Sequence, residues 1–402
     1  MNIVLLTDIP PCHNYTAGIV LNILCDFLLD AGHHVFCFTV MDPSLTPNIS
    51  PDKMERMKFE TVNKPKEDWG RKAFRKYASL IGNNATTLFQ LPSIMRKASA
   101  FCRENNADLL WSVVQGQTMI KLTEPTAKDA RIPYVIQVFD PPEWWMYENR
   151  FDRYTRASVM RAFARSLHNS KCCLAASWAM AEEYASQYNC KAIPVILGFS
   201  PENVSPAGNH DSEKFVIALS GQVYASEEFN ALIMGLNQLS WQHKGKQIIL
   251  RLYGSHFNMS FSDASRIEVR GWLLQDQLLP ELADADLLYC PYWFSEKYQA
   301  PARLSFPSKL STYLKTAQPV LIHAPEYASP RRFIKKNEAG YICDTLDPAG
   351  IANTIKMIMD LSEEERKATG EKGYRVFLST LTTAHMKDAF FAALEIGENV
   401  TD

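Results

Sequence analysis

One stretch of the sequence, residues 306–322, constrains the fold more than any other. It reads FPSKLSTYLKTAQPVLI. Pro307 suits the first position of a helix, where an N–H group would have no intrahelical partner. Apolar residues then recur at helical spacing until Pro319, which ends the helix directly before the aliphatic run 320–322. A short helix followed at once by a buried strand is typical of a parallel α/β sheet.

The start of this helix is also a candidate anion site. Its first N–H groups are unpaired and carry partial positive charge, so they can hold a phosphate. Ser308 and Lys309 lie at this end, and Arg303 precedes it. The alternative interpretation is an ordinary helix–strand unit without any ligand.

The composition sets the scale of the protein and excludes several classes. A chain of 402 residues predicts two α/β domains, and a formal net charge of −2 gives no reason to expect nucleic acid. Nine scattered cysteines without a C-x-x-C pair predict a reduced, cytoplasmic protein rather than a disulfide or zinc scaffold. The opening residues lack a charged leader, and no apolar run has membrane-spanning length.

The order of elements predicts two consecutive α/β halves. A segment rich in Pro, Gly, Ser and Asn, 198–212, separates them. In the first half the segment 42–82 is polar, contains proline and is basic, and residues 140–145 follow a strand directly, with an ordinary strand-to-helix loop as the alternative to a site. In the second half we expect a loop at 292–305. The expected strands are 3–7, 35–40, 108–114, 133–139, 174–177, 192–197, 215–219, 248–253, 287–291 and 320–322; the expected helices are 17–31, 118–130, 150–170, 227–239, 349–359, 363–377 and 386–394.

The segment 307–320 resembles the motif PSKLLEYLAAGKPV of GT-B glycosyltransferases, especially the bacterial family-4-like (group 1) enzymes. The resemblance extends over nearly the whole chain, including the helix start and Gly-His pair within 17–34. It implies an α/β fold of two Rossmann-like domains facing an interdomain cleft. The implied domains are 1–198 for the acceptor and 213–380 for the nucleotide sugar, with helix 383–398 returning to the first domain.

The resemblance also implies a donor site in the second half. The glycine after the first strand, Gly221, would offer backbone N–H groups to a diphosphate, and Trp272 could stack beside the nucleobase. Arg303 and Lys309 are the cations expected to stabilise the leaving diphosphate and are predicted as catalytic. The remaining donor-binding predictions are Gln222, Tyr224, Gly254, Leu273, Ser308 and Thr312.

The sequence departs from the family at the same site. The usual Arg and Lys after the first glycine fall at Gln222 and at Glu227 or Glu228, and the usual pair of glutamates falls at Leu304 and Thr312. Thr312 could still bond a ribose hydroxyl, although without a carboxylate's strength. These departures keep open a second class, a non-catalytic GT-B-fold binding or scaffold subunit, whereas a GT-B-fold epimerase fits the motifs less well.

Candidate acceptor residues follow the strands of the first half. Asp140 comes directly after strand 133–139 and is predicted as catalytic, because ligands bind beyond the carboxyl ends of parallel strands. Glu143 and Trp144 follow it and could bond and stack on a sugar; the alternative for the tryptophans is packing. Gln115 lies after the preceding strand. Gly18 permits close approach of a ligand or, equally, close packing of its helix on the sheet.

Residues 69–77 interleave Trp, Phe and Tyr with Arg and Lys. Such a segment suits peripheral contact with an anionic membrane, and the alternative is a solvated face or a basic acceptor groove. Taken together, we predict a glycosyltransferase that uses a nucleoside diphosphate sugar, needs no metal or cofactor, and acts on a glycan or lipid-linked acceptor in surface polysaccharide synthesis. Hexosyl transfer with retention is implied by the resemblance alone.

Overall fold

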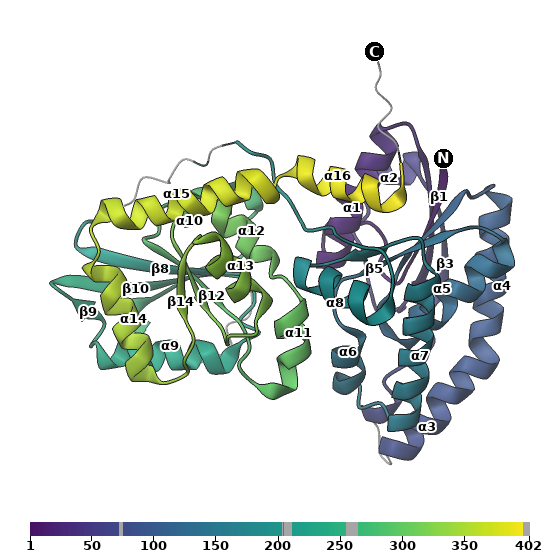
Figure 1. Cartoon of the computed structure of the whole chain (residues 1–402), viewed down its shortest axis with the longest axis horizontal. Coiled ribbons are helices and arrows are strands. Elements are labelled where there is room, and N and C mark those ends of the chain that lie inside the picture. Colours follow the sequence, from purple (N-terminus) through teal and green to yellow (C-terminus); the bar gives the residue numbers. More distant parts are fainter. Residues whose placement is uncertain (72–74, 203, 205–210, 255–263, 397–402) are drawn as a thin grey trace. The chain divides into compact units, whose positions relative to one another are not determined.

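The computed structural model describes residues 1–71, 75–202, 204, 211–254 and 264–396. These residues form two compact units (Figure 1). The first comprises Met1–Val195 together with the chain from Lys387, and the second comprises Ile196–Met386.

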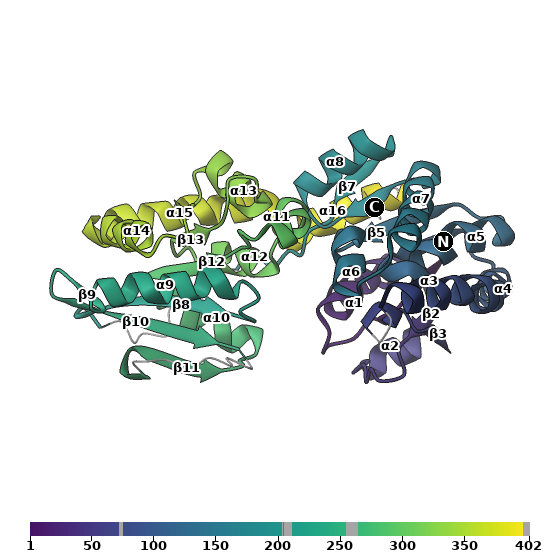
Figure 2. The same cartoon turned by 90° about the horizontal axis from the view of Figure 1, so that it is seen from below.

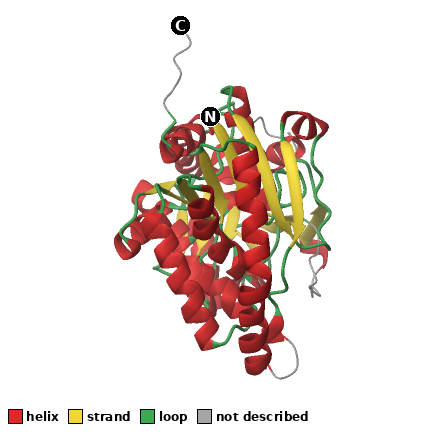
Figure 3. Cartoon of the chain, turned by 90° about the vertical axis from the view of Figure 1, so that its right-hand side faces the viewer, coloured by secondary structure: helices red, strands yellow, loops and turns green. Residues whose placement is uncertain are grey.

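The first unit is built on a parallel sheet of seven strands in the order β3-β2-β1-β4-β5-β6-β7. Helices pack around these strands (Figure 3). Buried aliphatic runs such as Asn2–Thr7 form the central strands, as expected for a sheet covered on both faces. The strands are β1 (Asn2–Thr7), β2 (His34–Met41), β3 (Lys58–Asn63), β4 (Leu109–Val113), β5 (Tyr134–Val138), β6 (Cys173–Ala175) and β7 (Ala192–Pro194).

The helices of this unit connect successive strands. Asp152 caps the longest one by accepting bonds from Tyr154 N at 3.0 Å and Thr155 N at 2.9 Å. The helical elements are α1 (Thr16–Asp30), α2 (Pro51–Arg56), η1 (Trp69–Arg71), α3 (Arg75–Ala85), η2 (Thr86–Gln90), α4 (Leu91–Glu104), α5 (Gly116–Ala130), α6 (Pro142–Glu148), α7 (Arg153–Asn169) and α8 (Trp178–Tyr188).

Several elements of the first unit were not predicted. The polar segment 42–82 contains α2 and the edge strand β3, which pairs in parallel with β2. Residues 140–145 are not all loop, because α6 begins at Pro142, where proline fits the first turn. The boundaries of two further elements also differ: α7 begins at Arg153 rather than residue 150, and β7 ends at Pro194 rather than 197.

The second unit contains a second sheet, with the order β11-β10-β8-β12-β13-β14 and a short strand, β9, antiparallel to β10. Figure 2 shows five of these strands in the same spatial order, from β13 at the top through β12, β8 and β10 to β11. The strands are β8 (Lys214–Ser220), β9 (Gln242–His243), β10 (Lys246–Tyr253), β11 (Ile267–Gly271), β12 (Leu287–Pro291), β13 (Val320–His323) and β14 (Tyr341–Cys343).

The helix and strand expected at 306–322 are confirmed, although the helix starts one residue later, with Pro307 as its N-cap. The expected loop 292–305 was partly wrong, because it contains the short helices η4 and α11. The helical elements are α9 (Ser226–Gln238), η3 (Ala264–Arg266), α10 (Gln275–Ala283), η4 (Glu296–Tyr298), α11 (Gln299–Leu304), α12 (Ser308–Lys315), α13 (Ser329–Asn337), α14 (Pro348–Asp360) and α15 (Glu363–Thr380).

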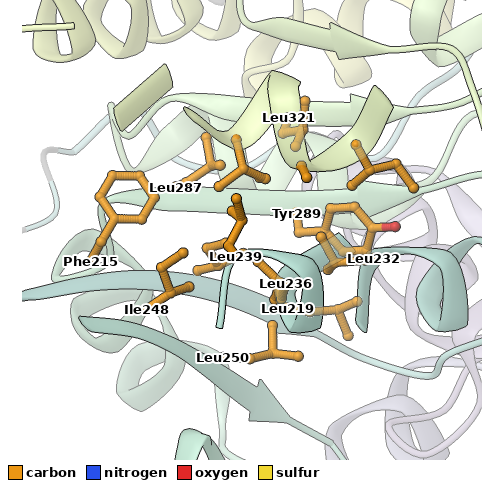
Figure 4. Close-up of a cluster of buried hydrophobic side chains, with 14 of the residues drawn as sticks. Phe215, Leu219, Leu232, Leu236, Leu239, Ile248, Leu250, Leu287, Tyr289 and Leu321 are labelled. Carbon is orange, nitrogen blue, oxygen red and sulfur yellow. The ribbon is translucent and has the colours of Figure 1, made fainter. Parts of the chain in front are cut away.

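A cluster of buried apolar side chains holds the second sheet against its helices (Figure 4). Leu232 and Leu236 of α9 meet Leu219 and Leu250 of the central strands, and all four are fully buried. This packing fixes the positions at which the strands end, which are the positions that matter for a ligand site.

The last helix, α16 (Thr383–Leu394), belongs to both units. Its first residues lie in the second unit, where Met386 Sδ accepts a bond from Gly198 N at 3.5 Å. Farther along, Phe390 packs on Trp111 of β4 with ring centroids 4.9 Å apart, and both side chains are buried. The end of the chain thus completes the core of the first unit.

Candidate active site

The candidate donor site lies at the carboxyl end of β8 in the second unit. β10 and β12 flank β8 on opposite sides, so the chain reverses its direction of winding there, which is where open α/β sheets bind ligands. Gly221 follows β8 with φ +81°, a left-handed conformation that glycine adopts without strain. Its N–H donates to Tyr253 O at 2.7 Å, which fixes the turn.

Lys309 reaches this turn from the first turn of α12. Its Nζ donates to Gln222 O at 3.3 Å and lies 4.7 Å from the centre of the Tyr224 ring. The half-buried side chain pairs with no carboxylate among the described residues, and loss of hydration lowers the pKa of the ammonium to about 8. A partly dehydrated cation that no described carboxylate neutralises is suited to bind an anion.

A buried tyrosine sets the position of Lys309 relative to Gly221. Tyr313, one turn farther along α12, accepts a bond at its hydroxyl oxygen from Ser220 N at 2.7 Å. The side chain is fully buried. The Ser220 hydroxyl also lies 3.3 Å from the Tyr313 hydroxyl, so two hydrogen bonds in the core hold the last residue of β8 to α12.

Aromatic rings form the wall beside Lys309. Trp293 Nε1 donates to Tyr224 O at 3.0 Å, and the two rings lie 4.8 Å apart. Tyr298 stacks on Trp293 with ring centroids 5.2 Å apart. The Tyr224 hydroxyl is buried and has no hydrogen-bond partner among the described residues. Trp293 was not predicted, although it follows the carboxyl end of β12, the same criterion that selected Trp144.

Glu228 shows how this chain uses a position where the resemblance expected a cation. Its carboxylate turns into the protein and accepts a bond from Phe294 N at 2.6 Å, while Glu227 is exposed. Burial raises the pKa of the Glu228 carboxyl. The residue therefore anchors the aromatic segment after β12 instead of opposing a diphosphate.

The structure brings together four of the predicted donor residues: Gly221, Gln222, Tyr224 and Lys309. Ser308 is exposed at the first position of α12, whereas Thr312 is buried one turn later. Arg303 lies partly exposed at the end of α11. Gly254 follows β10, and Trp272 and Leu273 follow β11, with the Trp272 side chain 68% exposed.

A second candidate site is a polar pocket of about 520 Å³ in the first unit. It lies where β1, β2, β3 and β4 end, because Asp8, Asp42, Lys64 and Gln115 come directly or almost directly after these strands. The other lining residues are Ile9, Pro43, Leu45, Pro65, Lys66, Glu67, Asp68, Trp145 and Asn149.

Three of the lining residues form a charged cluster. Lys64 Nζ lies 2.8 Å from Asp8 Oδ2 and 3.6 Å from Glu67 Oε2. Burial by itself would lower the pKa of Lys64, but the carboxylates of Glu67 and Asp8 raise it. Burial raises the pKa of the Glu67 carboxyl despite the opposing effect of Lys64. None of these three residues was predicted as a site residue.

Glu67 also fixes the start of α5. Thr118 N donates to Glu67 Oε1 at 2.5 Å, so the carboxylate accepts one of the unpaired N–H groups of the helix. Gly116, with φ +82°, leaves the space for this contact, because a Cβ there would lie 2.6 Å from Glu67 Oε2 and 3.1 Å from the Trp145 ring. The same interaction places Gln115 and Trp145 at the pocket.

The predicted acceptor residues are separated by the structure. Gln115 lines the pocket, but Asp140, Glu143, Trp144 and Gly18 are not among its lining residues. Asp140 follows β5, and Glu143 and Trp144 lie on α6. A Cβ on Gly18 would lie 2.2 Å from Cys12 Sγ, which favours the packing alternative for this glycine.

Replacing Trp145 by alanine tests whether the pocket holds a sugar. We expect a rise of about fivefold in the KM for the acceptor with little change in donor affinity, because a stacked aromatic ring contributes about 1 kcal/mol beyond its buried area. Steady-state kinetics with varied acceptor measures this. Tyr147→Ala is the control, since Tyr147 is exposed on the same helix and does not line the pocket; equal effects of both variants would contradict the assignment.

Comparisons with known proteins agree with this architecture. Residues 235–370 match the family model described as "Glucosyltransferase 3-like, C-terminal domain". A search of curated proteins found no match. Among solved structures, sucrose-phosphate synthase from Thermosynechococcus elongatus superposes with TM-score 0.70 at 14% identity, covering 98% of both chains. HepE from Anabaena, solved with UDP and glucose, gives 0.65 at 13% identity, covering 98% of this chain and 99% of that one.

A glycosyltransferase from Rickettsia africae also matches, with TM-score 0.64 at 11% identity over 98% of this chain and 99% of its own. The chain therefore has the GT-B fold, with two parallel Rossmann-like sheets. The predicted resemblance and the predicted fold class are confirmed. Identities this low establish the fold and leave the reaction to be argued from the site.

Two further properties concern the described part of the chain. Within it, no group of three or more His, Cys, Asp or Glu side chains is arranged to hold a metal ion. None of its helices is both long and apolar enough to cross a bilayer.

Proposed function

We propose that the chain is a glycosyltransferase that moves a hexosyl group from a nucleoside diphosphate sugar to a glycan or lipid-linked acceptor. The observation that carries the proposal is the position of Lys309. It presents a cation that pairs with no carboxylate in the described part of the chain to the glycine turn after β8, at the start of a helix. This arrangement suits the diphosphate of the donor.

In the proposed reaction the bond between the sugar and the diphosphate breaks as the acceptor hydroxyl attacks. Negative charge then develops on the departing diphosphate. Lys309 and the N–H groups at the start of α12 would stabilise that charge in a partly dehydrated site, where such interactions are strongest. Arg303, which lies in the last turn of the preceding helix α11, is the second cation proposed to take part.

The donor and setting are proposed from the comparisons and the resemblance. HepE was solved with UDP and glucose, and an E. coli protein matched at TM-score 0.63 and 10% identity was solved with UDP-2-fluoro glucose. These titles support a uridine diphosphate hexose as the first donor to test. Retention of configuration, a role in surface polysaccharide synthesis and action at the cytoplasmic face of the cell membrane remain proposals by resemblance.

A non-catalytic subunit with the same fold is the second candidate. The observation that favours it is the burial of Leu304 and Thr312, which occupy the positions of the family's glutamates and offer no carboxylate. Such a subunit would bind a nucleotide sugar or a glycan without transferring the sugar.

A thermal-shift screen with UDP-, GDP-, ADP-, CMP- and dTDP-sugars, followed by a hydrolysis and transfer assay, separates the candidates. A ligand at a hundred times its Kd stabilises the native state by about 2.7 kcal/mol. We expect stabilisation by one class of donor and release of free nucleotide when acceptor is present. Binding without turnover for any acceptor would favour the scaffold, and the absence of binding to every nucleotide would overturn the donor site.

A further inference from the structure

A hollow in the first unit shares no lining residue with the polar pocket described above. It has a volume of about 420 Å³ and lies between η2, α4, α5 and α7. α5 packs on both α4 and α7, and Figure 1 shows these three helices together. Small-molecule sites in proteins have volumes of about 300–1,000 Å³, so the hollow is large enough for a ligand of its own.

Apolar side chains form most of the wall of the hollow. Leu91 and Met95 contribute to it from α4, and Leu122 and Pro125 contribute from α5. The two leucines are buried, whereas Met95 and Pro125 are half-buried. A ligand with an apolar body would therefore lose its contact with water against this wall, which is favourable.

The short element η2 forms one side of the hollow. Its backbone is π-helical, a rare geometry that often occurs at functional sites. Thr87 of this turn lines the hollow, and the next two side chains, Leu88 and Phe89, are 67% and 79% exposed. Large apolar side chains that are exposed beside an apolar hollow are typical of a ligand groove.

Two cations line the same hollow, and neither pairs with a carboxylate among the described residues. Lys121 of α5 is half-buried, and its Nζ donates to Thr87 Oγ1 at 2.9 Å. Loss of hydration lowers the pKa of this ammonium, although Glu67 opposes the shift. Arg161 of α7 is exposed. An anion in the hollow would replace the hydration that Lys121 has lost.

The neighbouring contact between α5 and α7 pairs its charges in the ordinary way. Glu124 is buried, and its carboxylate lies 2.5 Å from Arg165 Nε and 2.6 Å from Lys128 Nζ. Lys121 and Arg161 lie one turn earlier on these two helices, where the described residues that line the hollow include no Asp or Glu. The counter-charge that this position lacks could be supplied by a ligand.

We propose that the hollow binds an amphipathic anion, a small molecule with a carboxylate or phosphate head group and an apolar body. Lys121 and Arg161 hold the head group by charge-assisted hydrogen bonds, which are stronger than those between neutral groups. The body lies against Leu91, Met95 and Leu122, where it buries apolar surface. This site lies wholly within the first unit, and the proposal does not depend on the transfer reaction.

Isothermal titration calorimetry of the full chain tests the proposal with decanoate and decyl phosphate, each below its micelle concentration. We expect both to bind, and we expect no binding of decyltrimethylammonium, which has the same chain and the opposite charge. Inorganic phosphate should bind at least about tenfold more weakly than decyl phosphate, because it has no hydrocarbon to bury. Equal binding of all three amphiphiles would overturn the proposal, since the cations would then have no role.

Variants of the lining residues locate the binding. Lys121→Gln and Arg161→Gln should each weaken decanoate binding by at least about tenfold, because each removes a charge-assisted hydrogen bond. Met95→Trp fills part of the hollow and should weaken binding without a change of charge. The matched controls are Lys97→Gln on α4 and Arg156→Gln on α7, exposed cations that do not line the hollow. Circular dichroism checks that every variant is folded, and equal losses in the test and control variants would overturn the proposal.

Vesicle co-sedimentation separates this site from a membrane contact. Residues 69–77, where the sequence predicted such a contact, do not line the hollow, and the side chains of residues 71–76 lie outside the described part of the structure. We expect Lys121→Gln and Arg161→Gln to leave any binding to phosphatidylglycerol vesicles unchanged. Vesicle binding that both variants weaken, without binding of monomeric decanoate or decyl phosphate, would overturn the proposal and assign the two cations to a membrane surface.

Discussion

Replacing Lys309 by alanine is expected to weaken the binding of a nucleoside diphosphate sugar by roughly 10- to 100-fold. The variant removes a charge-assisted hydrogen bond to the diphosphate, which contributes about 1.5–3 kcal/mol. Isothermal titration calorimetry measures the change directly. Lys335→Ala, an exposed cation on α13, is the control for loss of charge alone. Unchanged affinity in Lys309→Ala would contradict the assignment of the donor site.

The same residue predicts how donor binding depends on pH. The pKa of Lys309 is lowered to about 8, so the free site loses its charge as the pH rises through this value. Affinity is therefore expected to be full near pH 7 and to fall about tenfold by pH 9, because only the protonated form binds the diphosphate well. Lys309→Arg should retain binding and lose this pH dependence, since arginine stays charged throughout. The same fall in both proteins would assign it to another group.

The free energy of unfolding of the protein without ligand should rise with pH, whereas its affinity for the donor falls. The folded-state pKa lies below the unfolded value of 10.5, so the unfolded chain binds the proton more tightly between about pH 8 and 10.5. Lys309 therefore makes the folded state less stable below pH 8 than above 10.5. A residue that lowers stability while it is charged, yet is needed for binding, is what a ligand site requires.

Replacing Glu67 by alanine is expected to destabilise the first unit by about 3 kcal/mol. The change leaves the buried ammonium of Lys64 with Asp8 as its one remaining partner among the described residues and leaves Thr118 N without an acceptor. Equilibrium denaturation measures the loss, and hydrogen exchange should locate it at the start of α5. The KM for the acceptor should rise as well, because Gln115 and Trp145 are positioned by the same contact.

Asp68→Ala is the matched control for Glu67→Ala. Asp68 lines the same pocket and is the next residue in the sequence, but it forms a surface pair with Lys66 at 3.7 Å. Exposed pairs contribute between 0 and about 1 kcal/mol, so its replacement should change stability little. A similar loss from both variants would show that the pocket senses overall charge rather than the buried contact of Glu67.

The parts of the fold that could be predicted are those with a strong local signal. Buried strands such as β8 and β13 are aliphatic runs, and the sequence 306–322 encodes its own helix start and end. β3 escaped prediction because its residues, KFETVN, are half-exposed at the edge of the sheet and carry no apolar run. Ser50 and Pro51 were the available local signal, and they mark the start of α2, which precedes β3.

The candidate site residues differ in the same way: some have a local sequence signal and others depend on contacts between distant positions. Lys309 could be predicted as a site residue because its neighbours in the sequence, above all Pro307, mark the start of its helix. The contact between Glu67 and Thr118 joins positions 51 residues apart, and that between Glu228 and Phe294 joins positions 66 apart. No periodicity in the sequence reports such pairings, because they are created by the ends of separate strands meeting at one edge of a sheet.

The double membership of α16 has a consequence for the order of synthesis. Trp111 of β4 is translated early, but its partner Phe390 leaves the ribosome only after the whole second unit. The unit that is begun first is therefore completed last, and until then it exposes part of its apolar core. The second unit is continuous from Ile196 to Met386, so its core needs no segment that is translated later. During translation the nascent first unit is the part of this protein that most needs protection from aggregation.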